Sequence, residues 1–524
     1  MSLINKKDDS RFQKALGTTI TSLSDHKFKL SFFIFLIACS FIFFFRLDIP
    51  SIRMWDESRL AVNALEMVIN KNLIVTYFDG KPDMWNTKPP LLIWFIALSM
   101  KYFGFNEFAL RLPSAICGMT TAVILFLFCK NYFHDLRAGI ASGLVLITSL
   151  GFIRGHIARS GDYDAMLVLW VVAYSISFFS YLHTKKQKQY LYLLIATIAL
   201  VLAVWTKGIA GLMCLPGLLL YTAWQKKLKR LLFSPEFYIA FMFFLIFSLG
   251  YYLLRDYYNP GYINAVMKNE LTGRYLNTVE NHSGDFLFYY KDLISFKFLP
   301  WIYILPLCFM ITQFSRRKLM KNFSLFCFIY ITFYFLIISF AKTKLSWYDA
   351  PLYPMASLVI GLGISEGFQA LENYFQIENK LKRLGLLSLL IICIFLIPYF
   401  DVAYAKIYKK NEIMYSDSNG VKPQLMYGDY LKIITNNQSK LKNIYVVKDK
   451  NYNAQLLFYA KVANLKGYSI KLTSFEDKVL KLGDTAITCS PEIQMKLEQH
   501  YSLKSLHSNN SCNTFKIDGL KPKA

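Results

Sequence analysis

The sequence has 524 residues, of which 55% are hydrophobic, 17% are aromatic and only 18% carry a charged side chain. A soluble globular protein usually has more charge and fewer aromatic residues, so the composition argues against one. The formal net charge of +25 would suggest nucleic-acid binding in a soluble chain, but no such motif occurs, and no nucleic-acid partner is expected.

Apolar runs of membrane-spanning length recur between residues 28 and 400. Each is about as long as a helix must be to cross roughly 30 Å of hydrocarbon, and the runs are too continuous for the strands of a membrane barrel. We therefore predict an α-helical polytopic membrane protein with about eleven to thirteen transmembrane helices. The spans expected are 28–46, 113–130, 138–153, 165–183, 190–205, 209–224, 237–254, 296–313, 323–340, 348–367 and 384–400.

Basic residues predict the orientation of these spans, because Lys and Arg concentrate in cytoplasmic loops. Loops 184–189, 225–230 and 315–321 are strongly basic and are expected in the cytoplasm. Counting spans from them also places the N-terminal segment 1–27 in the cytoplasm. The first apolar run lacks a following cleavage site and is expected to remain as a transmembrane helix. The loops expected outside are 47–112, 154–164 and 255–295.

Two segments are not predicted to span the membrane. The apolar stretch 90–104 is short and is predicted as an interfacial or re-entrant helix. Residues 405–524 follow the transmembrane domain 28–404 and are polar, with β-rich runs alternating with helix-like runs. This alternation predicts a small α/β domain outside the membrane, for which an accessory role is expected. An oxidising compartment would allow Cys489 and Cys512 to pair there, and the sequence leaves the pairing open.

Charged residues gather in the loops expected outside. A carboxylate can take a proton from an acceptor hydroxyl, and Lys or Arg can hold a phosphate and stabilise it as a leaving group. A lone charge beside a span is more often an interfacial anchor. A functional role is favoured for Asp56, which lies in an aromatic setting, and for Lys88, which two prolines hold in an extended segment. The combination predicts group transfer from a lipid phosphate to a hydroxyl.

The motifs "WDESRLAVNALEM", "WNTKPPLLIW", "GHIARSGDYDAMLVLW" and "WTKGIAG" follow one another in an order that resembles a known family. The chain is similar to the integral-membrane glycosyltransferases with the GT-C fold, in the branch of the bacterial protein O-mannosyltransferase-like proteins and the aminoarabinose transferases of lipid A. This resemblance implies a polyprenyl-phosphate-linked sugar donor, a multi-pass location in a bacterial-type cytoplasmic (inner) membrane, and transfer on its outer side. The acceptor stays open among a protein hydroxyl, lipid A and another glycolipid.

The resemblance also implies roles for individual residues. Asp56 matches a first-loop acidic residue that acts as general base, Glu57 completes the acidic pair beside it, and Asp164 matches the acidic position of the second loop. The residues expected at the donor phosphate are Arg59, Lys88, Arg274 and Tyr348. Further candidates for the site are His282, Asp162, Lys207 and Lys344.

No cofactor is established by the sequence. Relatives of the aminoarabinose type carry an acidic residue directly before the motif lysine, and this chain has Thr87 there. A divalent metal bound as in those relatives is therefore disfavoured, and no metal ligand is predicted.

Two other functions remain as alternatives at this stage. A polytopic lipid or solute transporter or flippase would often show internal repeats and charges near the middle of the bilayer. No clear repeat is evident, and the candidate charges cluster at one face. A structural subunit that binds a partner through its C-terminal domain is the third interpretation.

Overall fold

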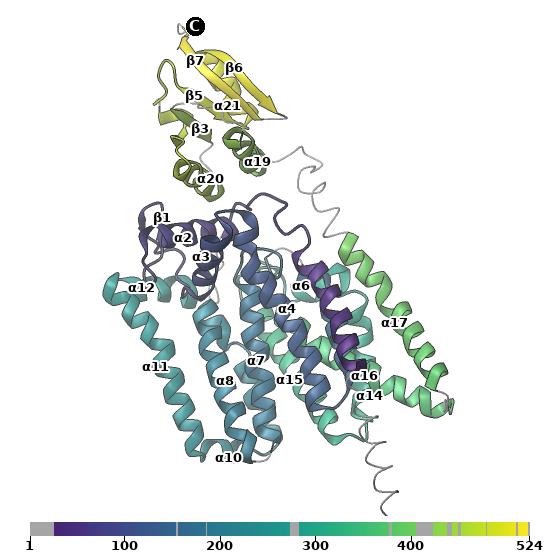
Figure 1. Ribbon diagram of the computed structural model, residues 1–524. Coiled ribbons are helices and arrows are strands. Elements are labelled where there is room, and N and C mark those ends of the chain that lie inside the picture. The colour runs from purple at the N-terminus through teal and green to yellow at the C-terminus, as the bar shows by residue number, and fades with distance from the viewer. Residues whose placement is uncertain are drawn as a thin grey trace, which may run out of the picture.

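The computed structural model describes residues 26–153, 156–184, 186–272, 282–376, 380–404, 423–436, 443–448, 452–477, 479–509 and 512–521. Figure 1 shows a bundle of long helices with a smaller domain of strands and helices at one end. The bundle holds the apolar part of the chain and the small domain holds the polar tail, as the change in composition predicts.

A helix corresponds to each predicted span. The bundle helices are His26–Phe44, α4 (Glu107–Tyr132), α5 (Leu136–Ile147) with α6 (Leu150–Ile153), α7 (Asp164–His183), α8 (Lys186–Lys207), α9 (Leu215–Trp224), α11 (Pro235–Tyr258), α14 (Trp301–Gln313), α15 (Lys318–Phe340), α16 (Leu352–Tyr374) and α17 (Lys380–Val402). Among the described residues, seven helices are individually long and apolar enough to cross a membrane. An eighth results if the helical pair Phe288–Lys297 and Trp301–Gln313, which meet at 102°, forms one bent span. The chain is a multi-pass membrane protein.

The remaining predicted spans are shorter or less apolar helices that pack within the bundle. α5 and α9 are short, and α16 is long but carries glycines and serines along most of its length. These small residues allow close packing. A Cβ at Gly361 would lie 2.6 Å from the backbone nitrogen of Ser142, and a Cβ at Gly363 would lie 2.6 Å from the Cα of Cys308. α16 therefore lies directly against α5 and α14.

The two ends of the bundle differ. The short helix α10 (Leu228–Leu232), which follows a basic loop, lies at the end opposite the C-terminal domain in Figure 1. The other end, which we call the site end, carries α2, α3 and α12 beside that domain. α3 covers most of the segment 90–104 and is a 13-residue helix, too short to span a bilayer. The elements of the site end are α2 (Asp56–Asn70), β1 (Tyr77–Phe78), β2 (Lys81–Pro82), α3 (Leu91–Phe103), η1 (Gly208–Leu212), α12 (Tyr262–Val266), η2 (Met267–Thr272), α13 (Phe288–Asp292) and η3 (Leu293–Lys297).

The C-terminal domain is a five-stranded mixed sheet with helices packed against it. Its elements are α19 (Pro423–Asn436), β3 (Ile444–Lys448), α20 (Ala454–Leu465), β4 (Ile470–Ser474), η5 (Phe475–Asp477), β5 (Thr485–Thr488), α21 (Pro491–His500), β6 (Tyr501–Asn509) and β7 (Cys512–Leu520). The strand order is β4-β3-β5-β7-β6, with β3 parallel to β4 and β5, and β7 antiparallel to β5 and β6. The predicted α/β alternation is confirmed. Cys489 and Cys512 form a disulfide between the end of β5 and the start of β7.

This domain is attached to the bundle through α20, which lies against α2. The hydroxyl of Tyr459 accepts a hydrogen bond from the backbone nitrogen of Ile52 at 2.9 Å and donates one to Glu107 at 2.5 Å. Lys461 forms an ion pair with Glu66 of α2 at 3.1 Å. The segment before α2 and the start of α4 are thus both held by the C-terminal domain.

Candidate functional site

The two adjacent carboxylates at the start of α2 occupy different environments, because neighbouring residues of a helix point in different directions. Asp56 is exposed toward a cavity, whereas Glu57 is buried and accepts two hydrogen bonds from Arg111, at 2.6 and 3.1 Å. Glu57 also accepts from the backbone nitrogens of Arg53 and Gly161, each at 3.0 Å. Burial alone would raise the pKa of Glu57, but the charge and hydrogen bonds of Arg111 lower it by more. The pKa of Glu57 therefore lies below its usual range. Glu57 therefore fixes the loops around Asp56 and does not face the cavity.

Arg59 is held by Asp83, a residue of the same loop. The guanidinium donates to both carboxylate oxygens, at 2.7 and 2.9 Å, in a bidentate pair. Asp83 is fully buried in its side chain and also accepts from the side chain of Asn63 and from the backbone nitrogens of Trp85 and Asn86. This carboxylate thus organises the whole turn that precedes Lys88.

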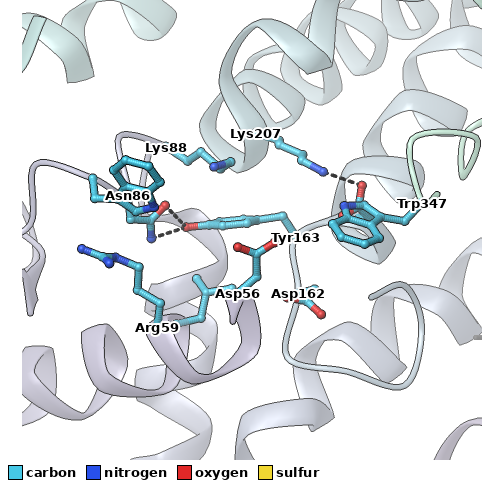
Figure 2. A pocket seen from close by; sticks show the side chains of 11 residues that line it. Asp56, Arg59, Asn86, Lys88, Asp162, Tyr163, Lys207 and Trp347 are labelled. Atoms are coloured by element: carbon cyan, nitrogen blue, oxygen red, sulfur yellow. Dashed lines mark hydrogen bonds and ion pairs between the residues drawn. The ribbon is translucent and has the colours of Figure 1, made fainter. Parts of the chain in front are cut away.

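Asn86 connects this turn to the segment 156–164, which leads into α7. Its side chain exchanges hydrogen bonds with the hydroxyl of Tyr163, at 2.9 and 3.2 Å, and Figure 2 shows the Tyr163 ring lying across the middle of the pocket. The ammonium of Lys88 lies 5.6 Å from the centre of that ring and 3.4 Å from the carboxylate of Glu270. Lys88 thus reaches the pocket from the side opposite Asp162 (Figure 2).

A second buried cation comes from the end of α8. Lys207 donates to Asp164, the first residue of α7, at 2.6 Å, and both side chains are at most 8% exposed. The ammonium also lies 5.3 Å from the ring centre of Tyr348. Burying this pair between two helix ends places a positive charge beside an apolar wall, where an anionic group would interact with it strongly.

An apolar groove of about 530 Å³ begins at these two lysines and continues between the helices. Its polar end holds Lys88, Lys207, Asp164, Glu270 and Tyr348, and the rest is lined mainly by aliphatic side chains of η1, α9 and α15. A groove of this kind suits a lipid whose charged headgroup lies at the lysines.

A wider cavity of about 730 Å³ lies on the other side of Asp56. Its lining is rich in aromatic residues, and one of them comes from the C-terminal domain: Tyr452 stacks on Trp55 with ring centres 5.2 Å apart. The Tyr452 hydroxyl also accepts a hydrogen bond from Arg59 at 3.4 Å. A small polar pocket that includes Asp56, Lys88 and Lys207 joins this cavity to the groove. Asp56 therefore lies between two spaces of different chemical character.

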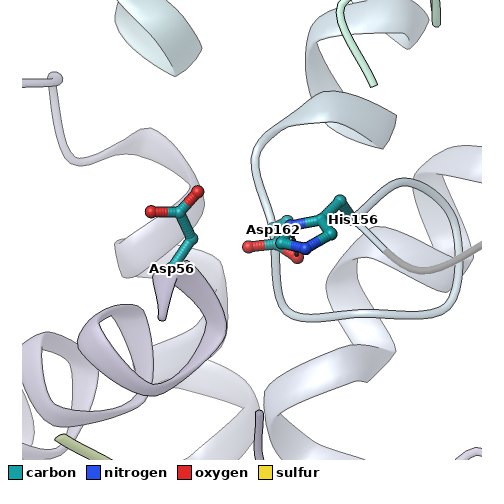
Figure 3. Close-up of side chains that lie close together, drawn as sticks. All are labelled: Asp56, His156 and Asp162. Carbon is teal, nitrogen blue, oxygen red and sulfur yellow. Dashed lines mark ion pairs between the residues drawn. The ribbon is translucent and has the colours of Figure 1, made fainter. Parts of the chain in front are cut away.

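His156 and Asp162 face Asp56 across the pocket, as Figure 3 shows. The ring of His156 stacks on Trp347 with centres 3.8 Å apart, and its Nδ1 lies 3.3 Å from a carboxylate oxygen of Asp162. Burial alone lowers the pKa of His156, but the Asp162 carboxylate outweighs this effect, so the pKa is raised above its ordinary value.

The structure brings most of the residues expected from the sequence to one place. Asp56, Arg59, Lys88, Asp162, Asp164 and Lys207 line the small pocket; Tyr348 lies in the groove and His282 in the wider cavity. Glu57 and Lys344 do not join them. The Lys344 ammonium instead donates to the carbonyls of Ser339 and Ala341 at the C-terminal end of α15. Arg274 lies outside the described residues.

Several residues of the site are absent from the sequence-based expectation. They are Asp83, Asn86, Tyr163, Glu270, Trp347 and Tyr452. Asp83 and Asn86 belong to the same short segment as Lys88, so the density of polar residues in "PDMWNTK" could have indicated them. The others come from distant segments, and only the fold shows that they meet.

The position before the motif lysine does not suit a metal. The Thr87 hydroxyl donates to Glu270 at 3.3 Å, and the same carboxylate pairs with Lys88. A carboxylate already neutralised by a lysine, beside a hydroxyl, is a poor donor set for a divalent cation.

Comparison with known proteins agrees with the fold. Residues 87–252 match the family described as dolichyl-phosphate-mannose-protein mannosyltransferase. Undecaprenyl phosphate-alpha-4-amino-4-deoxy-L-arabinose arabinosyl transferase 2 of Proteus mirabilis is 27% identical over 335 residues, which are 63% of this chain and 59% of that protein. The corresponding transferase of Pseudomonas savastanoi pv. phaseolicola is 28% identical over 368 residues, or 68% of this chain and 67% of that protein. The matched region thus spans about three fifths to two thirds of these relatives' lengths.

A solved structure is similar over nearly the whole chain. It is ArnT from Cupriavidus metallidurans bound to undecaprenyl phosphate, with a TM-score of 0.69, 17% sequence identity, and coverage of 92% of this chain and 97% of that one. At this level of identity the likeness establishes the fold alone. The chain is thus similar in fold to ArnT and in sequence to the undecaprenyl-phosphate aminoarabinose transferases, and its residues 87–252 match the protein mannosyltransferase family.

Proposed function

We propose that this protein is a membrane glycosyltransferase that moves a sugar from a polyprenyl-phosphate donor to an acceptor hydroxyl at the site end of the bundle. The observation that carries the proposal is the position of Asp56 between the groove, which ends at Lys88 and Lys207, and the wider cavity. The names of the relatives, which act on undecaprenyl-phosphate-linked aminoarabinose, support a donor of this class.

In this proposal the donor's polyprenyl chain lies in the groove and its phosphate lies between Lys88 and Lys207. Both ammonium groups are close to carboxylates, Glu270 and Asp164, so an arriving phosphate would share cations that are already in place. Such preorganised charge stabilises the phosphate as it leaves, because no side chain has to reorganise during the reaction. Tyr348 lines the same end of the groove, and Arg274 is expected there from the family resemblance.

The acceptor enters from the wider cavity, with its hydroxyl beside Asp56. The acceptor oxygen attacks the anomeric carbon from the face opposite the phosphate, the bond from that carbon to the phosphate oxygen breaks, and the electron pair leaves with the polyprenyl phosphate. Asp56 accepts the hydroxyl proton. The product is the inverted glycoside. Glu57 contributes by fixing the start of α2, and Arg59 lines the cavity that receives the acceptor.

The orientation follows from the charge distribution. The basic loop before α10 lies at the end of the bundle opposite the proposed site, and basic loops are cytoplasmic. The site and the C-terminal domain would therefore be on the outer side of a bacterial-type inner membrane, and the N-terminal segment in the cytoplasm. A disulfide in the C-terminal domain is consistent with an oxidising compartment.

The decisive experiment uses the purified full chain in detergent with undecaprenyl-phosphate sugars and, as acceptors, lipid A, other glycolipids and peptides carrying Ser or Thr. Release of undecaprenyl phosphate and glycosylation of the acceptor are followed by mass spectrometry. Asp56→Asn should reduce turnover by about 10²–10⁴-fold, because a positioned base typically contributes that much. The exposed Asp48→Asn variant is the matched control and should keep the wild-type rate. Wild-type turnover by Asp56→Asn would rule out Asp56 as the general base. If the wild-type protein consumed no donor, a transferase would be ruled out in favour of a transporter.

A further inference from the structure

One carboxylate oxygen in the segment 156–164 has no hydrogen-bond partner within the described part of the chain. It is Oδ1 of Asp162, whereas Oδ2 of the same carboxylate lies 3.3 Å from Nδ1 of His156; all three atoms are buried. Asp162 is only 3% exposed. Buried polar groups in native proteins nearly always have a partner, and leaving one without a hydrogen bond costs about 1–3 kcal/mol. A buried carboxylate oxygen without a partner, beside an imidazole nitrogen and a second carboxylate, indicates a missing ligand.

The same atoms face the carboxylate of Asp56. Ligand atoms of Asp56, His156 and Asp162 all lie within 4.8 Å of one another. Figure 3 shows Asp56 on one side of the gap, with Asp162 and His156 together on the other. Two carboxylates this close repel each other unless a cation lies between them.

We propose that Asp56, His156 and Asp162 form a binding site for a first-row divalent cation such as Mn²⁺ or Zn²⁺. Two ligand atoms that each lie about 2.1 Å from a metal, at an angle of about 90–110°, are roughly 3.0–3.4 Å apart. The separation of 3.3 Å between His156 Nδ1 and Asp162 Oδ2 falls in this range. The limit of 4.8 Å for the set means that Asp56 must approach the other two ligands by at most about 1.4–1.8 Å to complete the site.

The donor set also selects the class of metal. Mg²⁺ and Ca²⁺ prefer oxygen ligands alone, whereas an imidazole combined with carboxylates suits Mn²⁺, Fe²⁺ or Zn²⁺. Three protein ligands would leave further coordination positions open, and two of the three ligands, Asp56 and His156, line the wider cavity. Trp347 packs flat on the His156 ring and would hold the imidazole in place.

This site differs from the position before the motif lysine, where Thr87, Lys88 and Glu270 leave no suitable donor set. It rests on the proposed function only in that Asp56 faces the reacting atoms. A carboxylate bound to the metal through one oxygen keeps its second oxygen available to the acceptor hydroxyl.

The test is a titration of the chelator-treated full chain in detergent, without any sugar donor. Mn²⁺ binding is followed by electron paramagnetic resonance and Zn²⁺ binding by calorimetry. The wild type should bind one equivalent of metal. Asp162→Asn and His156→Gln, two variants of nearly conserved shape, should each weaken binding by about tenfold or more. Asp48→Asn is the control for a surface carboxylate, and Glu270→Gln tests the position beside Lys88; both should bind metal as the wild type does.

The absence of saturable binding to the wild type would overturn the proposal. So would retention of wild-type affinity by both Asp162→Asn and His156→Gln, or loss of binding on Glu270→Gln alone. Because the titration contains no donor, such a result would leave the turnover comparison of Asp56→Asn and Asp48→Asn unaffected. Conversely, normal turnover by Asp56→Asn would remove the proposed base whatever the titration shows.

Discussion

Replacing Asp83 with Asn should destabilise the site end of the bundle and reduce turnover together. The carboxylate is fully buried in its side chain and receives two charge-assisted hydrogen bonds from Arg59, at 2.7 and 2.9 Å. Breaking a buried ion pair from one side costs about 3–5 kcal/mol. The Arg59 side chain is 16% exposed, so water recovers part of this loss, and we expect a decrease of about 3 kcal/mol in the free energy of unfolding.

The effect should reach Asn86, because Asp83 also holds the backbone nitrogen of that residue, and the Asn86 side chain binds Tyr163. Thermal unfolding of the detergent-solubilised variant, followed by intrinsic fluorescence, measures the loss. Burial alone would raise the pKa of Asp83, but its hydrogen bonds with Arg59 lower it by more. The pKa of Asp83 therefore lies below its ordinary value. A depressed pKa means that the stabilisation is complete above about pH 4 and is lost only as the pH falls through the folded-state pKa. The difference between variant and wild type should therefore be constant from about pH 5 to 8.

Asp79→Asn is the matched control, since Asp79 belongs to the same loop but has a side chain that is 70% exposed. It should unfold at the wild-type temperature and keep wild-type turnover. If Asp83→Asn also unfolded at the wild-type temperature, the bidentate pair would contribute nothing measurable and the reasoning would be wrong.

Substitutions at three further residues test separate parts of the protein. Lys88→Ala should lower kcat/KM for the donor by about 10–100-fold, because one hydrogen bond to a charged group is worth about that much. The measurement is a donor titration at saturating acceptor, and unchanged donor kinetics would show that Lys88 does not contact the donor. Tyr452→Ala should raise the KM for the acceptor and leave the KM for the donor unchanged, because Tyr452 lines the wider cavity and not the groove. Tyr452→Phe is the control and should retain the stacking on Trp55. Equal effects of Tyr452→Ala on both KM values would contradict the assignment of the wider cavity to the acceptor and the groove to the donor. Cys512→Ser should destabilise the C-terminal domain by about 2–4 kcal/mol in thermal unfolding, as should a reducing agent on the wild type, and an unchanged transition would show that the disulfide is dispensable.

The helical bundle is largely predictable from the sequence because its signal is local. An apolar run of sufficient length specifies a helix, and helices are found at all the predicted spans, including the less apolar α16. The strands β3, β4, β5 and β7 were likewise indicated by β-rich runs. No such run marks β6, because much of this exposed strand is polar.

The site was predictable only where chemistry and position coincide in one segment. Asp56, Lys88, Asp164 and Lys207 stand out as charges beside apolar runs, and the structure brings them to one pocket. Glu57 has the same sequence signal as Asp56, but it is turned inward toward Arg111, a partner that lies 54 positions away. Which of two adjacent carboxylates faces the cavity depends on contacts between distant segments, and these contacts are not written in the local pattern.

The bond between Ile52 and Tyr459 joins residues that are 407 positions apart. At about 5–20 residues per second, a ribosome needs roughly 20 to 80 s to synthesise the intervening chain. The segment before Asp56 is therefore synthesised long before α20, and its hydrogen bond to Tyr459 can form only after α20 has been made and folded. A chain interrupted before α20 would lack both the bond from Ile52 to Tyr459 and the side chain of Tyr452, which lines the wider cavity. Incomplete copies would therefore reach the membrane with an incomplete cavity beside Asp56.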